Sequence, residues 1–154
     1  MSEEKVHPHE EVDQIAFGVV TVSSSRTLEE DESGDSIAEA IETDGKAVAT
    51  RKLVTDDREK IAATVEALVE RPDIDAIVST GGTGLSPEDV TVEAVRPLLD
   101  QEIPGFGELF RYLSYEDVGP HALLSRAFAG SRGGVVIFCL PGSEQAATFG
   151  TEGL

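Results

Sequence analysis

The chain has 154 residues, enough for one domain with a substantial hydrophobic core. Its 30 acidic and 12 basic residues give a formal net charge of −18, which argues against nucleic acid and anionic membranes as primary partners, because both bind basic surfaces. The single cysteine, Cys139, excludes an internal disulfide and a multi-cysteine metal cage, and its apolar neighbours indicate a core position.

The acidic residues are spread along the whole chain, and the basic residues comprise only 4 lysines beside 8 arginines. Such a surface promotes solubility, suits a basic partner, or is an adaptation to a high-salt cytoplasm, where screening removes the self-repulsion. Of these three interpretations, we favour the salt adaptation.

We expect a mobile tail over residues 1–13 and a single domain over residues 14–154. The N-terminal stretch MSEEKVHPHEE has neither the basic nor the apolar segment of a signal peptide. No apolar run reaches the roughly 18 residues of a membrane span. The sequence therefore predicts a cytoplasmic protein that does not interact with membranes.

The domain begins with a strand and a helix. A nearly continuous β-branched run predicts a strand over residues 14–23, buried on both faces of a parallel sheet. A polar loop follows, and apolar spacing predicts a helix over residues 36–44. Asp35 is expected to cap the start of this helix, and Gly45 to end it.

A second strand is predicted over residues 47–54 and a second helix after Asp56-Asp57, where one aspartate is expected to cap the helix and the other to face a ligand pocket. This helix must stop before Pro72, because proline disfavours a helical residue before it. A short apolar run then predicts a buried strand over residues 74–79.

The remaining elements are a helix over residues 90–99, a mostly helical stretch over residues 104–128 and a final strand over residues 134–140. Turns are expected at Gly119-Pro120 and at Gly130. Strands that alternate with helices indicate an α/β fold, with a mostly parallel sheet covered by helices on both faces.

In open α/β sheets, ligands bind beyond the carboxyl ends of the strands. Three polar loops, over residues 23–35, 79–90 and 140–145, are expected to meet there. The middle loop reads STGGTGLSPEDV and runs from a predicted strand into a helix.

The glycines of this loop let backbone N–H groups approach an anion closely, and its threonines add hydroxyl donors. It is not a Walker A loop, because the glycine spacing differs and no lysine follows. A phosphate cradle is our preferred interpretation, and a tight strand-to-helix turn without a ligand is the alternative. The candidate binding residues are Thr80, Gly81, Gly82, Thr83 and Gly84.

Asp89 follows the glycine loop, at the expected entrance to the next helix. It either complements the helix dipole or holds a magnesium ion against phosphate oxygens. Arg26 and Arg126 are candidates for phosphate binding, and surface ion pairing is their alternative role.

Several motifs, in this order, are similar to the MoaB/Mog family of molybdenum-cofactor biosynthesis proteins. They are TVSSSR, DESGD, STGGTGLSPEDVT, IPGFGELFRYLS, LLSRAFAG and VIFCLPGS, which together span roughly residues 14–146. Each glycine motif alone is weak, but the ordered combination is highly specific.

The resemblance implies a three-layer α/β/α fold that binds molybdopterin and assembles as a homotrimer or homohexamer. It also implies a molybdopterin adenylyltransferase that joins ATP to molybdopterin with magnesium and releases pyrophosphate. A later-acting protein then inserts the metal, molybdenum or tungsten. Alternatives within the same fold are a non-catalytic molybdopterin-binding protein, a nucleotide hydrolase and a structural scaffold.

The resemblance also assigns roles to single residues. Asp56 and Asp89 match catalytic, magnesium-binding aspartates, and an aspartate at position 56 favours an active member. The substrate-binding residues that it implies are Ser23, Thr80, Gly81, Gly82, Thr83, Gly84, Ser114, Ser125, Pro141, Gly142 and Ser143. The spacing between Ser114 and Ser125 resembles the MoaB type.

Overall fold

The computed structural model describes residues 14–142. The predicted tail over residues 1–13 and the predicted site residue Ser143 therefore lie outside the described residues. In the described part of the chain, no helix is both long and apolar enough to span a membrane.

The centre of the fold is a six-stranded sheet with the strand order β2-β1-β3-β6-β5-β4. Strands β2, β1, β3 and β6 are parallel to one another, whereas β5 is antiparallel to β6 and β4 is antiparallel to β5. The prediction of a mostly parallel sheet is confirmed. The strands are β1 (Ala16–Val22), β2 (Ala47–Val54), β3 (Ala76–Thr80), β4 (Gln101–Glu102), β5 (Phe128–Arg132) and β6 (Val135–Leu140).

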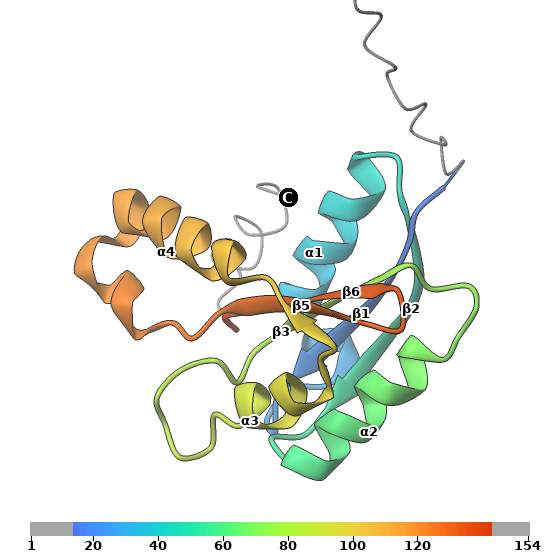
Figure 1. Cartoon of the computed structure of the whole chain (residues 1–154), viewed down its shortest axis with the longest axis horizontal. Coiled ribbons are helices and arrows are strands. Elements are labelled where there is room, and N and C mark those ends of the chain that lie inside the picture. The colour runs from blue at the N-terminus through green and yellow to red at the C-terminus, as the bar shows by residue number, and fades with distance from the viewer. Residues whose placement is uncertain (1–13, 143–154) are drawn as a thin grey trace, which may run out of the picture.

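Helices cover both faces of the sheet: α1 and α4 lie on one face and α2 and α3 on the other (Figure 1). This arrangement confirms the three-layer α/β/α prediction. The helices are α1 (Glu32–Thr43), α2 (Arg58–Val69), α3 (Thr91–Val95) and α4 (Pro104–Val118), and the 3-10 turns are η1 (Leu28–Glu30), η2 (Arg96–Leu98) and η3 (Gly119–Leu124).

A hydrophobic cluster lies on each face, and the strands contribute alternate residues to the two. Ile61 and Val65 of α2 pack on the face that includes Ile77 and Cys139. Cys139 is fully buried, as predicted, and its burial raises the pKa of the thiol to about 12.

Helix α1 begins earlier than predicted, at Glu32. Its N-cap is Asp31 rather than Asp35, and the Asp31 carboxylate accepts a hydrogen bond from the amide of Gly34 at 3.0 Å. Asp31 is buried and also pairs with Thr21 and Arg51, so a tertiary network fixes the start of this helix. A Cβ atom at Gly34 would lie 2.1 Å from that carboxylate, which explains the glycine in the helix.

The predicted turn at Gly130 is wrong, because Gly130 lies within β5 and pairs with Ile137. Strands β4 and β5 were not predicted. The sequence of β5, FAGSR, carries glycine and serine and has little intrinsic strand preference. Its pairing with β6 across Gly133-Gly134, both with positive φ, determines its conformation.

Strands β1 and β3 are neighbours, but the chain leaves them toward opposite faces, into α1 and into α3. This divergence opens a crevice at the carboxyl ends of the strands, where doubly wound sheets bind ligands.

Candidate functional site

A cavity of about 560 Å³ lies at the carboxyl ends of the parallel strands. Loops from β1, β2, β3 and β6 meet there, together with the end of η3, as the topology predicts. The cavity is lined by Val22, Ser23, Ser24, Ser25, Arg26, Asp56, Gly81, Gly82, Thr83, Gly84, Glu88, Asp89, Leu124, Ser125, Pro141 and Gly142.

The structure brings most of the predicted site residues together in this cavity: Ser23, Asp56, Gly81, Gly82, Thr83, Gly84, Asp89, Ser125, Pro141 and Gly142. Two predicted residues do not line it. Thr80 is buried below the loop, and its hydroxyl donates to the carbonyl of Pro141 at 2.8 Å. Ser114 lies on α4 and does not reach the cavity wall.

The glycine loop is packed tightly between β1 and α3. Gly81 and Gly82 have φ values of 104° and 74°, which other residues rarely adopt. A Cβ atom at Gly81 would lie 2.3 Å from the carbonyl oxygen of Val22, and one at Gly82 would lie 2.2 Å from the Thr91 hydroxyl. These positions therefore require glycine both for backbone conformation and for space.

The hydrogen bonds of the loop leave its amides available. The hydroxyl of Thr91 donates to the carbonyl of Gly81 at 2.8 Å, and its amide donates to the carbonyl of Gly82 at 3.1 Å. Within residues 14–142, the amides of Gly82, Thr83 and Gly84 have no acceptor. Three unpaired donors on a cavity wall favour an anionic ligand.

Asp56 and Asp57 have the two separate roles that the sequence predicts. Asp57 caps α2, since its side chain accepts from the amide of Lys60 at 2.9 Å. Asp56 lines the cavity instead, and its Oδ2 atom accepts from the Ser24 hydroxyl at 2.7 Å.

Asp89 is not a helix cap. Helix α3 begins at Thr91, after Val90, and no side chain caps it. The Oδ2 atom of Asp89 accepts from the amide of Ser86 at 3.0 Å, and its carboxylate lies against Gly84. Hydrogen bonding within the loop thus holds this carboxylate beside the unpaired amides.

The donor set in the cavity fits magnesium. Asp56 and Asp89 each keep their Oδ1 atom free of hydrogen bonds within the described residues. Two carboxylates that leave positions for water and phosphate oxygens are a typical protein environment of Mg²⁺. No group of three or more acidic, histidine or cysteine residues in this part of the chain could hold an ion alone, so substrate oxygens would complete the coordination.

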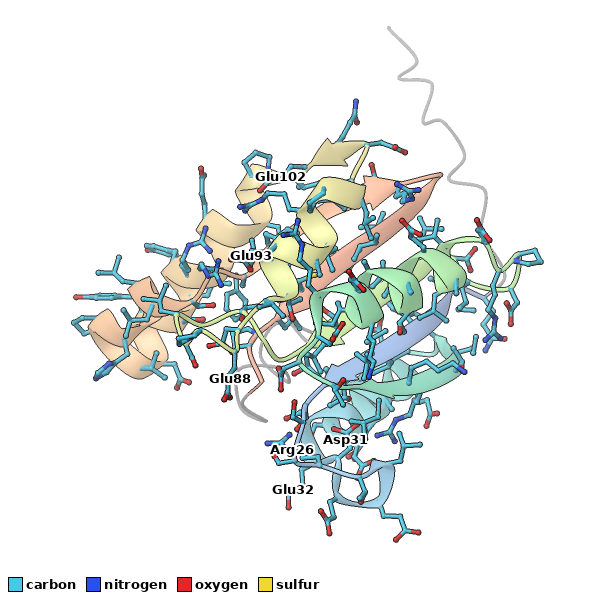
Figure 2. The ribbon with its side chains drawn as sticks, turned by 90° about the horizontal axis from the view of Figure 1, so that it is seen from below. Arg26, Asp31, Glu32, Glu88, Glu93 and Glu102 are labelled. Carbon is cyan, nitrogen blue, oxygen red and sulfur yellow. The ribbon has the colours of Figure 1, made fainter. Side chains whose placement is uncertain are left out.

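Arg26 supplies positive charge to the cavity wall (Figure 2). Its Nη1 atom donates to the Ser33 hydroxyl at 3.1 Å, and this hydroxyl donates to the carbonyl of Gly142 at 2.9 Å. In residues 14–142, no carboxylate forms an ion pair with Arg26. Its charge is therefore available to a ligand.

Arg126, unlike Arg26, lies outside the cavity wall. Its guanidinium donates to the carbonyls of Gly84 and Asp89 and forms an ion pair with Glu93, and it does not line the cavity. Of its two proposed roles, ion pairing is the one the structure contains.

Sequence reasoning missed several residues of the cavity. Ser24 and Ser25 adjoin the predicted Ser23, and their place in a serine run was the available signal. Glu88 precedes Asp89. Leu124 and the supporting residue Ser33 lie in the motifs LLSRAFAG and DESGD, but nothing within those motifs distinguished them from their neighbours.

The sequence matches a known family over nearly its whole length. The family model described as "Probable molybdopterin binding domain" covers residues 18–154. Molybdenum cofactor biosynthesis protein B of Staphylococcus aureus (strain COL) is 48% identical over 143 residues, which are 91% of this chain and 84% of that protein. The protein of the same name from Bacillus cereus is 44% identical over 141 residues, which are 91% and 83% of the two chains.

Solved structures agree with these matches. A crystal structure of a molybdenum cofactor biosynthesis protein B has a TM-score of 0.89 at 44% identity, covering 92% of this chain and 88% of that one. The tungsten cofactor synthesizing protein MoaB from Pyrococcus furiosus has a TM-score of 0.81 at 38% identity, covering 90% and 89%. The resemblance expected from the motifs is confirmed.

Proposed function

Since the chain belongs to the MoaB-type family of molybdopterin-binding domains, we propose that it transfers the adenylyl group of ATP to molybdopterin in the cytoplasm. The broader role, molybdenum or tungsten cofactor biosynthesis, follows from its close relatives. The choice between the two metals does not affect this step, because the metal enters after it.

The observation that carries this proposal is the presence of two carboxylates and an amide-rich glycine loop in one cavity. Asp56 and Asp89 line the same cavity as Gly82–Gly84. A carboxylate can also accept from the N–H groups of a pterin ring, so it is the combination with unpaired backbone amides, which suit an anion, that favours phosphate chemistry. Paired carboxylates beside free amides suit a reaction in which two phosphate groups meet.

In the proposed reaction, an oxygen of the terminal phosphate of molybdopterin attacks the α-phosphorus of ATP. The bond from the α-phosphorus to the bridging oxygen breaks, and pyrophosphate leaves with that oxygen. A phosphate monoester is already mostly ionised near neutral pH, so no strong general base is required.

The residues of the cavity would have different roles in this reaction. The amides of Gly82, Thr83 and Gly84 bind phosphate oxygens, and Arg26 adds a positive charge that no carboxylate of residues 14–142 pairs with. Asp56 and Asp89 would hold Mg²⁺, which neutralises phosphate oxygens and stabilises the leaving pyrophosphate when it is bound. Local donors thus offset the net negative charge of the chain.

The other predicted residues suit the two substrates. Ser125 is assigned to the pterin and Pro141-Gly142 to the nucleotide by the family resemblance, and all three line the cavity. Ser114, which the family resemblance implies near the pterin, lies on α4 outside it. Ser114 could therefore contact the pterin only if the bound pterin extended beyond this cavity to α4.

We further propose a homotrimer or homohexamer that passes its product to a metal-inserting protein. Large apolar side chains exposed on α4 and η3 support self-association, because monomers rarely expose many of them together. They are Leu109, Tyr112, Tyr115, Val118, Leu123 and Leu124.

The decisive experiment mixes the purified protein with ATP, Mg²⁺ and molybdopterin and analyses the products by mass spectrometry. We expect adenylylated molybdopterin and one equivalent of pyrophosphate. Pterin binding without product would instead indicate a carrier, and ATP cleavage without pterin would indicate a hydrolase. Omitting Mg²⁺ should abolish product formation, whereas undiminished product would contradict the metal role of Asp56 and Asp89.

A further inference from the structure

We propose that Arg126 is a positioning residue that holds the glycine loop, and with it Asp89, in its working geometry from outside the cavity. Its effect on the reaction depends on the function proposed above, but its effect on the loop does not.

Arg126 donates three hydrogen bonds to one loop. Its amide donates to the carbonyl of Thr83 at 2.8 Å. In its side chain, Nε donates to the carbonyl of Gly84 at 2.9 Å and Nη2 to the carbonyl of Asp89 at 3.0 Å. One residue therefore binds three carbonyl groups, two of them at the ends of the segment that runs from Gly84 to Asp89.

Glu93 fixes the guanidinium in this orientation. It lies on α3, directly after the loop (Figure 2), and its Oε1 atom is 2.5 Å from Nη1 of Arg126. The hydrogen bond from Arg126 lowers the pKa of Glu93. Arg58 is the other cation that acts on this carboxylate. The ion pair connects the loop to the helix that follows it.

The segment from Gly84 to Asp89 has few other attachments. Its remaining hydrogen bonds within residues 14–142 are internal, joining Ser86 to Asp89 and to Glu88. Internal bonds give the turn its shape but do not fix its place relative to Asp56. Because exposed loops held by few bonds open locally at low cost, the Arg126 contacts should determine the position of Asp89.

A direct contact between Arg126 and a substrate phosphate is the competing role. It would require the guanidinium to leave two carbonyls and a carboxylate. Replacing Glu93 separates the two roles. Loss of the ion pair would release Arg126 toward a phosphate and maintain or raise activity, whereas a positioning role predicts reduced activity.

The test uses Arg126→Lys, which keeps the charge but cannot donate to Gly84, Asp89 and Glu93 together, and Glu93→Gln, an exposed change that should not disturb folding. Arg132→Lys is the matched control, because Arg132 lies at the end of β5, the strand that follows Arg126, and donates to the carbonyl of Leu98, away from the cavity. Hydrogen exchange of the ligand-free proteins reports on the loop, and steady-state kinetics report on the reaction.

We expect faster amide exchange over residues 84–89 in Arg126→Lys and in Glu93→Gln, and no change in Arg132→Lys. The kcat of Arg126→Lys should fall by roughly 10- to 100-fold, and that of Glu93→Gln less. The double variant should be no slower than Arg126→Lys, because both changes remove the same constraint.

Unchanged exchange in both variants would overturn the proposal. A second pattern would also overturn it: Glu93→Gln keeps the wild-type kcat, and Arg126→Lys raises only the KM for ATP. If the wild-type protein forms no adenylylated product, the proposed function fails, while the exchange measurement still tests the role of Arg126 in the loop.

Discussion

The side chain of Ser24 and the residue Asp56 exchange two hydrogen bonds across the cavity wall. The Ser24 hydroxyl donates to Oδ2 of Asp56 at 2.7 Å, and the Asp56 amide donates to the same hydroxyl oxygen at 3.1 Å. The two residues follow β1 and β2, so the pair joins two loops that are distant in sequence. Among residues 14–142, it leaves Oδ1 of Asp56 free to bind a ligand.

We expect Ser24→Ala to reduce kcat by roughly tenfold, because partners that orient a metal-binding carboxylate contribute about this much. Asp56→Ala should reduce it further, and the double variant should be no slower than Asp56→Ala alone. Steady-state kinetics of pyrophosphate release measure all three. Thr27→Ala, in the same loop but with a side chain that caps nothing, is the control. Additive losses would contradict a joint role of the pair.

Asp89→Asn should keep molybdopterin binding and lose adenylyl transfer, with kcat falling by about two orders of magnitude. The amide preserves the shape of the side chain and its hydrogen bond to Ser86 but removes the charge that binds the metal. Titration with molybdopterin and product analysis separate binding from turnover. Glu66→Gln, on the exposed surface of α2, controls for the loss of one charge. A wild-type rate in Asp89→Asn would refute the assignment.

Gly82→Ala should destabilise the fold by roughly 1–3 kcal/mol, because Gly82 has a φ of 74° and a methyl group there would meet the Thr91 hydroxyl. Chemical denaturation gives the free energy of unfolding. Gly105→Ala is a matched control, since a Cβ atom at Gly105 meets no atom within 4 Å and its φ is not in the positive region. Equal stability of the two variants would show that the loop tolerates side chains.

Salt should stabilise the protein. A net charge of −18 creates self-repulsion that is screened as the ionic strength rises. We expect the thermal unfolding midpoint to increase from about 0.1 M to about 2 M KCl. NaCl should act similarly if screening is the cause. A midpoint that stays constant or falls would favour the simpler interpretation of the acidic surface as a solubility feature.

Cys139 should resist alkylation near pH 8 in the folded protein. Burial raises the pKa of its thiol to about 12, so the reactive thiolate is scarce, and the side chain is inaccessible. At pH values between the ordinary pKa of a thiol and about 12, the Cys139 thiol loses its proton only in the unfolded chain. The free energy of unfolding should therefore decrease as the pH rises through this range. Mass spectrometry after alkylation measures the labelling. Rapid labelling of Cys139 in the absence of denaturant would contradict its buried position.

The parallel part of the sheet was accessible to sequence reasoning because each of its strands carries a local apolar signal. Strand β2 agrees with its predicted range, and Asp57 takes the capping role that was expected for one aspartate of its pair. The start of α1 was not accessible in this way. It depends on Asp31, whose partners Thr21 and Arg51 come from two strands.

In the site, too, residues with a local sequence signal could be predicted, whereas residues whose role depends on tertiary contacts could not. The glycine loop and Asp89 could be identified because one short segment contains them. Arg126 could not be assigned from sequence, because the carbonyls that engage it lie 37 and 42 residues away along the chain. Its role depends on tertiary contacts, not on its neighbours in the LLSRAFAG motif.

The Ser33 hydroxyl, bonded to both Arg26 and Gly142, has a consequence for redesign of the cavity. It links the loop after β1, the first turn of α1 and the segment after β6 through one oxygen atom. A replacement segment without the Arg26 guanidinium or the Ser33 hydroxyl would remove these bonds, and one that moves the Gly142 carbonyl would break the bond to Ser33. The three segments therefore form one module, and a chimaera with altered substrate preference should replace them together.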